Sequence, residues 1–144
     1  MPTALYRVIV ALLLLLPLAA HADDASDFAA ATNSQQATLL ESWAAQPAPA
    51  RVELINSLQQ GQISVDGQVK TLRLNNRLRG LIDTALASHQ LLAADPKLRL
   101  SAAQQLQKSA KPAQLKFLDQ QLAAEHDSDV HSALSLALAN LQLV

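Results

Sequence analysis

Leucine and alanine recur every three or four residues along almost the whole chain, and this spacing constrains the fold more than any other feature. Stripes that repeat at i, i+3, i+4 and i+7 are typical of amphipathic helices. Prolines and glycines interrupt the stripes and therefore set the helix boundaries. The pattern predicts an all-α fold with helices over residues 34–46, 49–60, 72–89, 95–106, 112–122 and 127–141.

Each predicted helix has an inner face, and every one except that over residues 72–89 has a start or stop signal. The signals are Ser34, Pro49, Gly61, Asp95-Pro96, Pro112 and Asp127 or Ser128. The residues predicted to face inward are Gln36, Leu39, Leu40, Trp43, Val52, Ile55, Leu58, Leu74, Leu78, Leu81, Ile82, Ala85, Leu86, His89, Leu98, Ala102, Leu106, Leu115, Leu118, Leu122, Val130, Leu134, Ala137, Leu138 and Leu141. We expect Trp43 to belong to the core and His89 to be buried with one backbone partner.

One segment has strand character. Ile63, Val65, Val69 and Thr71 flank Asp66-Gly67, the dipeptide favoured in a two-residue type I′ turn. A hairpin this short is marginal in water by itself. We therefore predict a small β-hairpin near residues 62–71 that lies against the helices.

The last three predicted helices contain an internal repeat. Two predicted helices begin with the same pattern of residue types, 32 residues apart. The first set is Asp95, Leu98, Arg99, Ala102 and Leu106, and the second is Asp127, Val130, His131, Leu134 and Leu138. Helix pairs of this period resemble HEAT-type units, which bury their apolar faces on their neighbours. The expected architecture is a short curved stack of HEAT-like antiparallel helix pairs over residues 23–144.

The N-terminus has the features of an export signal. Arg7 precedes an apolar run over residues 8–20, and Ala20-His21-Ala22 has the form of a cleavage site. Residues 1–22 are thus predicted to be a signal peptide, which places the mature chain in the periplasm. The alternative is that they remain as an uncleaved membrane anchor. Without Arg7, ten basic residues stand against twelve acidic ones, so the mature charge of −2 argues against a nucleic-acid partner. The mature chain contains no further apolar run long enough to span a bilayer.

No pattern in the sequence indicates catalysis. The chain lacks cysteine, a glycine-rich phosphate loop and a nucleophile elbow, so we expect no catalytic residue and no cofactor. The cluster over residues 125–131 combines two histidines with three acids and has the donors for a divalent cation. Its spacing fits no metal motif, and we interpret it as a loop whose acids cap the following helix.

The run LRLNNRLRG, residues 72–80, places three arginines and two asparagines at the start of a helix. Cations there oppose the helix dipole, so another interaction must favour them. Arg73, Asn75, Asn76, Arg77 and Arg79 are therefore the candidate junction or interaction residues. The favoured interpretation is that Arg73 and Arg77 bond to hairpin carbonyls or to nearby carboxylates, with Glu53 and Asp66 as candidates. The alternative is a site for a partner.

Four segments together resemble a known family. They are ATLLESWAAQPAPARVELINSLQQGQISVDG, LRLNNRLRGLIDTALASHQLL, DPKLRLSAAQQLQK and PAQLKFLDQQLAAEHDSDV. They are similar to the N-terminal extracytoplasmic region of the urea ABC-transporter permease subunit, in the branched-chain amino-acid permease family. The RLNNRLR run is the most specific part of this resemblance.

The resemblance implies an accessory or scaffold domain rather than an enzyme. Its partners would be the remainder of the permease complex and its substrate-binding protein. Family members continue into transmembrane helices, so the resemblance implies a chain truncated before that part, and no transport residue is carried over. The alternative is a stand-alone periplasmic module that binds proteins through a helical-repeat surface.

Overall fold

The computed structural model describes residues 24–143, and over this range the chain is all-α with one small antiparallel hairpin, as predicted. The predicted signal peptide, residues 1–22, lies outside the described residues. After a helical stretch over residues 24–30, the elements are α2 (Asn33–Ala45), the 3-10 helix η1 (Pro49–Arg51), α3 (Val52–Gln59), β1 (Gln62–Val65), β2 (Gln68–Thr71), α4 (Asn76–Gln90), α5 (Pro96–Ser109), the 3-10 helix η2 (Pro112–Gln114), α6 (Leu115–Ala124) and α7 (Ser128–Gln142).

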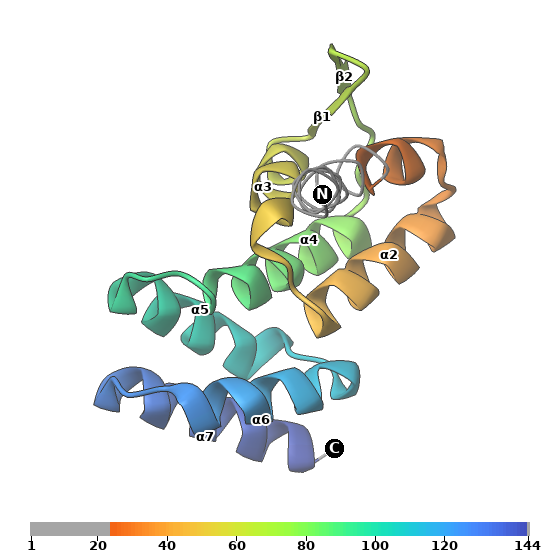
Figure 1. Cartoon of the computed structure of the whole chain (residues 1–144). Coiled ribbons are helices and arrows are strands. Elements are labelled where there is room, and N and C mark those ends of the chain that lie inside the picture. Colours follow the sequence, from red (N-terminus) through yellow and green to blue (C-terminus); the bar gives the residue numbers. More distant parts are fainter. Residues whose placement is uncertain (1–23, 144) are drawn as a thin grey trace, which may run out of the picture.

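The elements form two similar three-helix units stacked on one another (Figure 1). Unit 1 comprises α2, η1, α3 and α4, and unit 2 comprises α5, η2, α6 and α7. In unit 1, α4 packs against both α2 and α3, and in unit 2, α7 packs in the same way against α5 and α6. The units meet where α4 contacts α5 and where α2 contacts η2 and α6.

Equivalent capping residues support this internal relationship. The first helix of each unit is capped by Thr32 or Asp95, which are 63 residues apart. The same spacing separates Pro49 from Pro112, each of which opens a 3-10 helix. The sequence analysis predicted Ser34 as the N-cap of the first helix, and this prediction is wrong. Thr32 takes that position because it forms a reciprocal capping box with Gln35.

The 32-residue repeat also has a structural counterpart, because α5 and α7 pack side by side. Arg99 bonds to Glu125 near the N-terminal ends of the two helices, and Asn140 bonds to the carbonyl of Gln107 near their C-terminal ends. The two helices therefore run in the same direction. α6 lies between them in sequence and brings the chain back to the end at which α7 begins.

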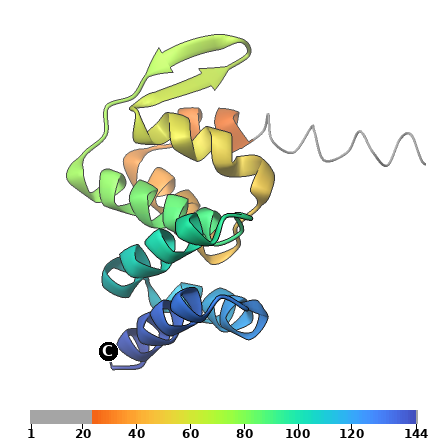
Figure 2. The same cartoon turned by 90° about the vertical axis from the view of Figure 1, so that its left-hand side faces the viewer.

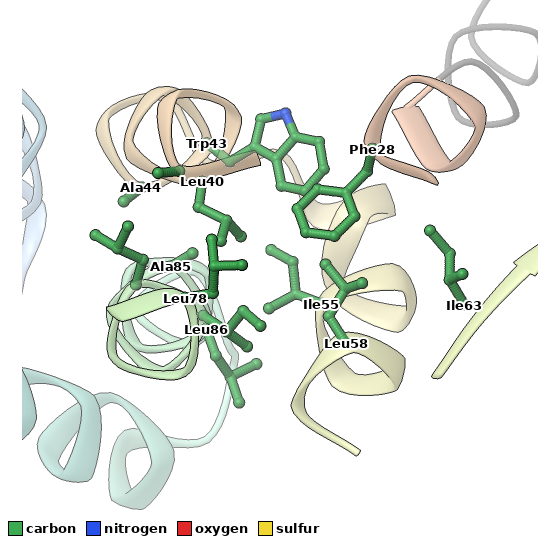
Figure 3. Close-up of a cluster of buried hydrophobic side chains, with 13 residues drawn as sticks. Phe28, Leu40, Trp43, Ala44, Ile55, Leu58, Ile63, Leu78, Ala85 and Leu86 are labelled. Carbon is green, nitrogen blue, oxygen red and sulfur yellow. The ribbon is translucent and has the colours of Figure 1, made fainter. Parts of the chain in front are cut away.

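Each unit has its own apolar core. The core of unit 1 gathers side chains from the 24–30 helix, α2, α3, β1 and one face of α4 (Figure 3). Within it, Trp43 is buried as predicted and stacks on Phe28 at a centroid distance of 5.7 Å. The core of unit 2 gathers residues of α5, α6 and α7, and it includes Ala87 and Leu91 at the C-terminal end of α4.

Two predicted inward-facing leucines are exposed instead. Leu98 and Leu115 both retain substantial contact with solvent. Each i+4 step rotates a position by about 40° around an α-helix, so Leu98 lies at the edge of the face centred on Leu106. In α6, the burial of Phe117 turns the inner face away from Leu115.

The hairpin has the predicted turn but projects from the stack. Asp66 and Gly67 have φ values of 52° and 77°, as a type I′ turn requires. Both views show the hairpin extending away from the helices (Figures 1 and 2). As predicted, β1 packs against α3, and its Ile63 is the one fully buried side chain of the two strands. Contrary to the prediction, β2 is exposed throughout. The hairpin is also attached by the Leu72 N–H, which donates to the carbonyl of Gly61 at 2.8 Å.

Ile63→Ala tests whether this one side chain anchors the hairpin. Ile63 is 0% exposed, so its truncation should lower the free energy of unfolding by about 2–5 kcal/mol. Val69→Ala is the matched control, because Val69 is a β-branched residue of the same hairpin with 68% exposure. Urea denaturation of both variants measures the difference. Equal small losses would show that Ile63 does not anchor the hairpin.

Candidate functional site

The structure separates the five residues singled out in the sequence. The Asn75 side chain caps α4 by accepting from the Leu78 N–H at 2.8 Å, and Asn76 is the first residue of the helix. Arg73, Arg77 and Arg79 are all exposed. Within residues 24–143, neither Arg73 nor Arg77 bonds to the hairpin, and the carboxylate nearest to Arg77 is that of Glu41 rather than Glu53 or Asp66, so this part of the sequence interpretation is corrected. Asn75 satisfies the start of α4, and backbone contacts attach the hairpin without the guanidinium groups.

Arg77 approaches α2 rather than the hairpin. Its guanidinium lies 4.0 Å from the Glu41 carboxylate, and the Arg77 side chain is 69% exposed. Such a pair contributes little to stability, because water screens both charges. Arg79 borders a shallow hollow with Leu58, Leu74 and Asp83. Arg77 thus lies on the α2 side of α4 and Arg79 on the α3 side, and both side chains are exposed and available for contacts outside the domain.

The strongest ion pair of the described part of the chain was not foreseen from the sequence. Arg99 holds Glu125 through two parallel bonds of 2.9 and 3.0 Å and also donates to the carbonyls of Ala93 and Ala94. The hydrogen bond from Arg99 lowers the pKa of Glu125, and the same bond raises the pKa of Arg99. This arginine therefore ties the α4–α5 turn to the α6–α7 turn.

The acidic cluster at residues 125–131 caps the helix that follows it, as the sequence analysis predicted. Asp127 accepts from the backbone N–H groups of Asp129 and Val130 at the start of α7. Glu125 is occupied by Arg99 and by the Asp127 N–H. Among the described residues, no group of three or more histidine or carboxylate side chains is arranged to hold a metal ion.

Buried polar side chains gather where the two units meet. The amide of Gln114 in η2 donates to the Ser88 hydroxyl of α4 at 2.6 Å. Next to it, His89 is buried as predicted. Its Nδ1 lies 2.7 Å from the Ala85 carbonyl, and its Nε2 accepts the Ala48 N–H at 3.2 Å. These bonds assign the proton to Nδ1, and burial lowers the pKa of the ring.

An apolar hollow of about 270 Å³ opens beside these residues. Its lining comprises Leu40, Glu41, Ala44, Leu81, Thr84, Lys111, Pro112, Ala113 and Gln114. A second hollow shares Ala113 and continues between the end of α2 and α6, past Lys116 and Phe117. We call the two together the seam groove. The first hollow has an apolar floor, whereas the second is lined mainly by polar side chains that include Gln46, Gln120 and Gln121. The charged side chains of the groove are Glu41, Lys111 and Lys116.

The buried Ser88 and His89 beside the seam groove do not form a nucleophile–base pair. Ser88 and His89 are neighbours in sequence, but the ring nitrogens of His89 are both occupied by backbone groups. The hydroxyl of Ser88 is bonded to Gln114. A nucleophile requires a base within hydrogen-bond reach, and this pair does not supply one. The groove is suited to binding, with apolar contacts on its floor and ion pairs at its rim.

No protein-family model matches the chain, nor does any curated protein or solved structure. Over residues 24–143, no helix is long and apolar enough to cross a membrane.

Two arginine substitutions test which cation stabilises the domain. Arg77→Ala should leave the melting temperature nearly unchanged, since Arg77 is exposed. Arg99→Ala should lower it by several degrees, because the Glu125 side chain, 7% exposed, loses both bonds to the guanidinium. Thermal unfolding followed by circular dichroism compares them. A large loss for Arg77→Ala would restore the structural role first predicted for it.

His89 should make the domain less stable in mild acid. Its pKa is lowered in the folded state, so the unfolded chain binds more protons as the pH falls below the ordinary value of 6.5. Stability is therefore fully present above pH 6.5 and declines until the lowered pKa is passed. His89→Gln keeps hydrogen-bonding capacity and does not titrate, so its stability should fall less between pH 7.5 and 5.5. Urea denaturation at both values measures the difference, and equal losses would contradict this account.

Proposed function

We propose that this chain is a non-catalytic scaffold domain of a urea-type ABC transporter permease, located on the extracytoplasmic face of the inner membrane. The resemblance of residues 37–67, 72–92, 95–108 and 112–130 to that region of the permease supports the assignment. The signal-like residues 1–22 support export. On this proposal, the domain holds a segment of another transporter subunit or of the substrate-binding protein.

The observation that carries the scaffold role is the seam groove. Its first hollow has an apolar floor that includes Leu40 and Leu81, and its second hollow adds polar side chains around Phe117. The buried polar side chains of the described residues are all engaged in bonds within the domain. Lys111 and Lys116 are exposed along this groove, whereas Glu41 lies near Arg77. The groove is therefore suited to a segment that combines apolar side chains with acidic residues.

One observation favours the alternative, a stand-alone periplasmic interaction module. In the described part of the chain, every buried side-chain nitrogen and oxygen has a hydrogen-bond partner. A domain with a satisfied interior does not depend on another subunit in order to fold. An experiment that identifies the protein bound in the seam groove can decide between the two functions.

A photo-reactive amino acid at Ala113 provides that experiment, because Ala113 is exposed and lines both hollows of the groove. Irradiation of cells with an assembled urea transporter should cross-link the domain to a permease subunit or to the binding protein. Lys111→Glu combined with Lys116→Glu should reduce the product several-fold, since both ion pairs would become repulsions.

Lys97→Glu is the matched control, because Lys97 is an exposed lysine of α5 that does not line the groove. It should leave the cross-link unchanged. Products that contain other periplasmic proteins and no transporter subunit would replace the permease proposal by the stand-alone module. Absence of any cross-linked protein would contradict both functions.

A further inference from the structure

The segment between α2 and η1, residues 46–48, depends on one histidine for its bond to α4. Pro47 and the following Pro49 have no backbone N–H, so Ala48 supplies the only backbone donor of these three residues. Its N–H donates to Nε2 of His89 at 3.2 Å. Among the described residues, this is the one hydrogen bond that joins residues 46–48, here called the 46–48 connection, to α4.

The ring of His89 accepts this bond only while it is neutral. Its Nδ1 lies 2.7 Å from the Ala85 carbonyl, which can only accept, so the proton is on Nδ1 and the lone pair is on Nε2. A second proton goes to Nε2 and makes both ring nitrogens donors. The new N–H then faces the N–H of Ala48, and the bond between them is lost. Protonation of His89 and attachment of the 46–48 connection therefore exclude each other.

The charges around the ring do not compensate an added proton. Burial lowers the pKa of His89 most, the bond to the Ala85 carbonyl acts in the opposite direction, and the positive charge of Arg51 lowers the pKa further. Asp24 is paired with Arg51 at 3.0 Å. The other charged side chains on α4 and on the described elements around it are not among the causes of this shift; they are Asp27, Glu41, Glu53, Arg77, Arg79, Asp83, Asp95, Lys97, Arg99, Lys108 and Lys111. A protonated ring is therefore stabilised by contact with water.

The 46–48 connection also forms part of the seam groove. Gln46 and Pro47 line its second hollow, and the remaining lining comes from Ala45, η2 and α6. α6 belongs to unit 2, where it packs against α7. The first hollow is lined by residues of α2, α4 and η2 and by Lys111, and the 46–48 connection is not part of it. Movement of the connection would therefore change the second hollow and leave the lining of the first in place.

We propose that protonation of His89 releases the 46–48 connection from α4 and displaces one wall of the second hollow, so that the seam groove binds its partner segment at neutral pH and releases it in mild acid. The ring has an ordinary pKa of 6.5 when it is free and a lowered pKa when it is attached. Attachment is therefore fully favoured above pH 6.5 and is lost as the pH falls below that value. The consequence for binding rests on the proposed function, because a segment that prefers the attached form loses affinity when the ring is protonated.

Two spin labels across the second hollow measure this movement. The chain contains no cysteine, so Gln46→Cys combined with Gln120→Cys places one label on the connection and one on α6, both at exposed positions. Distance measurements on the full chain should give a narrow distribution at pH 7.5 and a broader one at pH 5.5. Glu41→Cys with Lys111→Cys is the matched control across the first hollow and should give the same distribution at both values.

His89→Gln identifies the group responsible for the change. Glutamine does not titrate, so the distribution between positions 46 and 120 should then be the same at both pH values. Nuclear magnetic resonance of the parent chain provides a readout that requires no variant. The His89 ring and the Ala48 amide should titrate with one midpoint below pH 6.5, whereas the amide of Ala137, which is buried in α7, should not shift.

The outcomes separate the switch from its alternatives. A distribution between positions 46 and 120 that stays unchanged while the ring titrates would overturn the proposal, because His89 would then gain a proton without releasing the connection. Broadening of both label pairs would also overturn it, since acid would be unfolding the whole domain. A change that persists in His89→Gln would assign the movement to another group and overturn the role of His89.

The cross-link from position 113 tests the consequence for binding. In the parent chain it should decrease several-fold between pH 7.5 and pH 5.5, and in His89→Gln it should persist. A parent cross-link that is equally strong at both values would contradict regulation of the groove by His89. Absence of a cross-link already at pH 7.5 would contradict the proposed function, and the spin-label distances would still decide whether His89 moves the connection.

Discussion

The rest of the structure depends on the burial of α4 on two of its sides. One side, with Leu78, Ile82 and Ala85, completes the core of unit 1. Near its C-terminal end, Ala87 and Leu91 enter the core of unit 2. A helix buried in this way cannot shift or rotate without disturbing both cores, because close-packed side chains do not accommodate gradual movement. α4 therefore fixes how the units are placed and where the seam groove lies.

A helix with two buried sides must also satisfy its polar groups at the boundary between them. Ser88 and His89 occupy that boundary, and their partners come from elements distant in sequence, Gln114 and the backbone of Ala48. Buried polar groups are costly when unpaired, so the Gln114–Ser88 bond between the units favours one alignment of the units over others with similar apolar contact, whereas the His89–Ala48 bond fixes the end of α4 within unit 1. The Ser88 hydroxyl and both ring nitrogens of His89 are occupied by bonds within the domain.

The two units use equivalent positions in different ways, and the differences define the surfaces available for binding. Gln36 and Arg99 are 63 residues apart: Gln36 donates to the carbonyl of Phe28, whereas Arg99 pairs with Glu125. Between its second and third helices, unit 1 has the projecting hairpin, whereas unit 2 has the short turn of residues 125–127. The hairpin and the exposed side chains of Arg73, Arg77 and Arg79 lie in unit 1, while the uncharged C-terminal part of α7, residues 132–143, belongs to unit 2.

The sequence alone determined features that depend on near neighbours along the chain. The helices, the type I′ turn at Asp66-Gly67, the N-caps at Asp95 and Asp127, and the buried state of Trp43 follow from local spacing and local hydrogen bonds. Only the tertiary structure decided which partners each side chain meets. It exposed Leu98, turned Arg77 toward Glu41, paired Arg99 with Glu125, and assembled the seam groove from α2, α4, η2 and α6. The reason is that a stripe specifies a buried face but not the helix that covers it, and ion pairs between distant residues depend on how the helices stack.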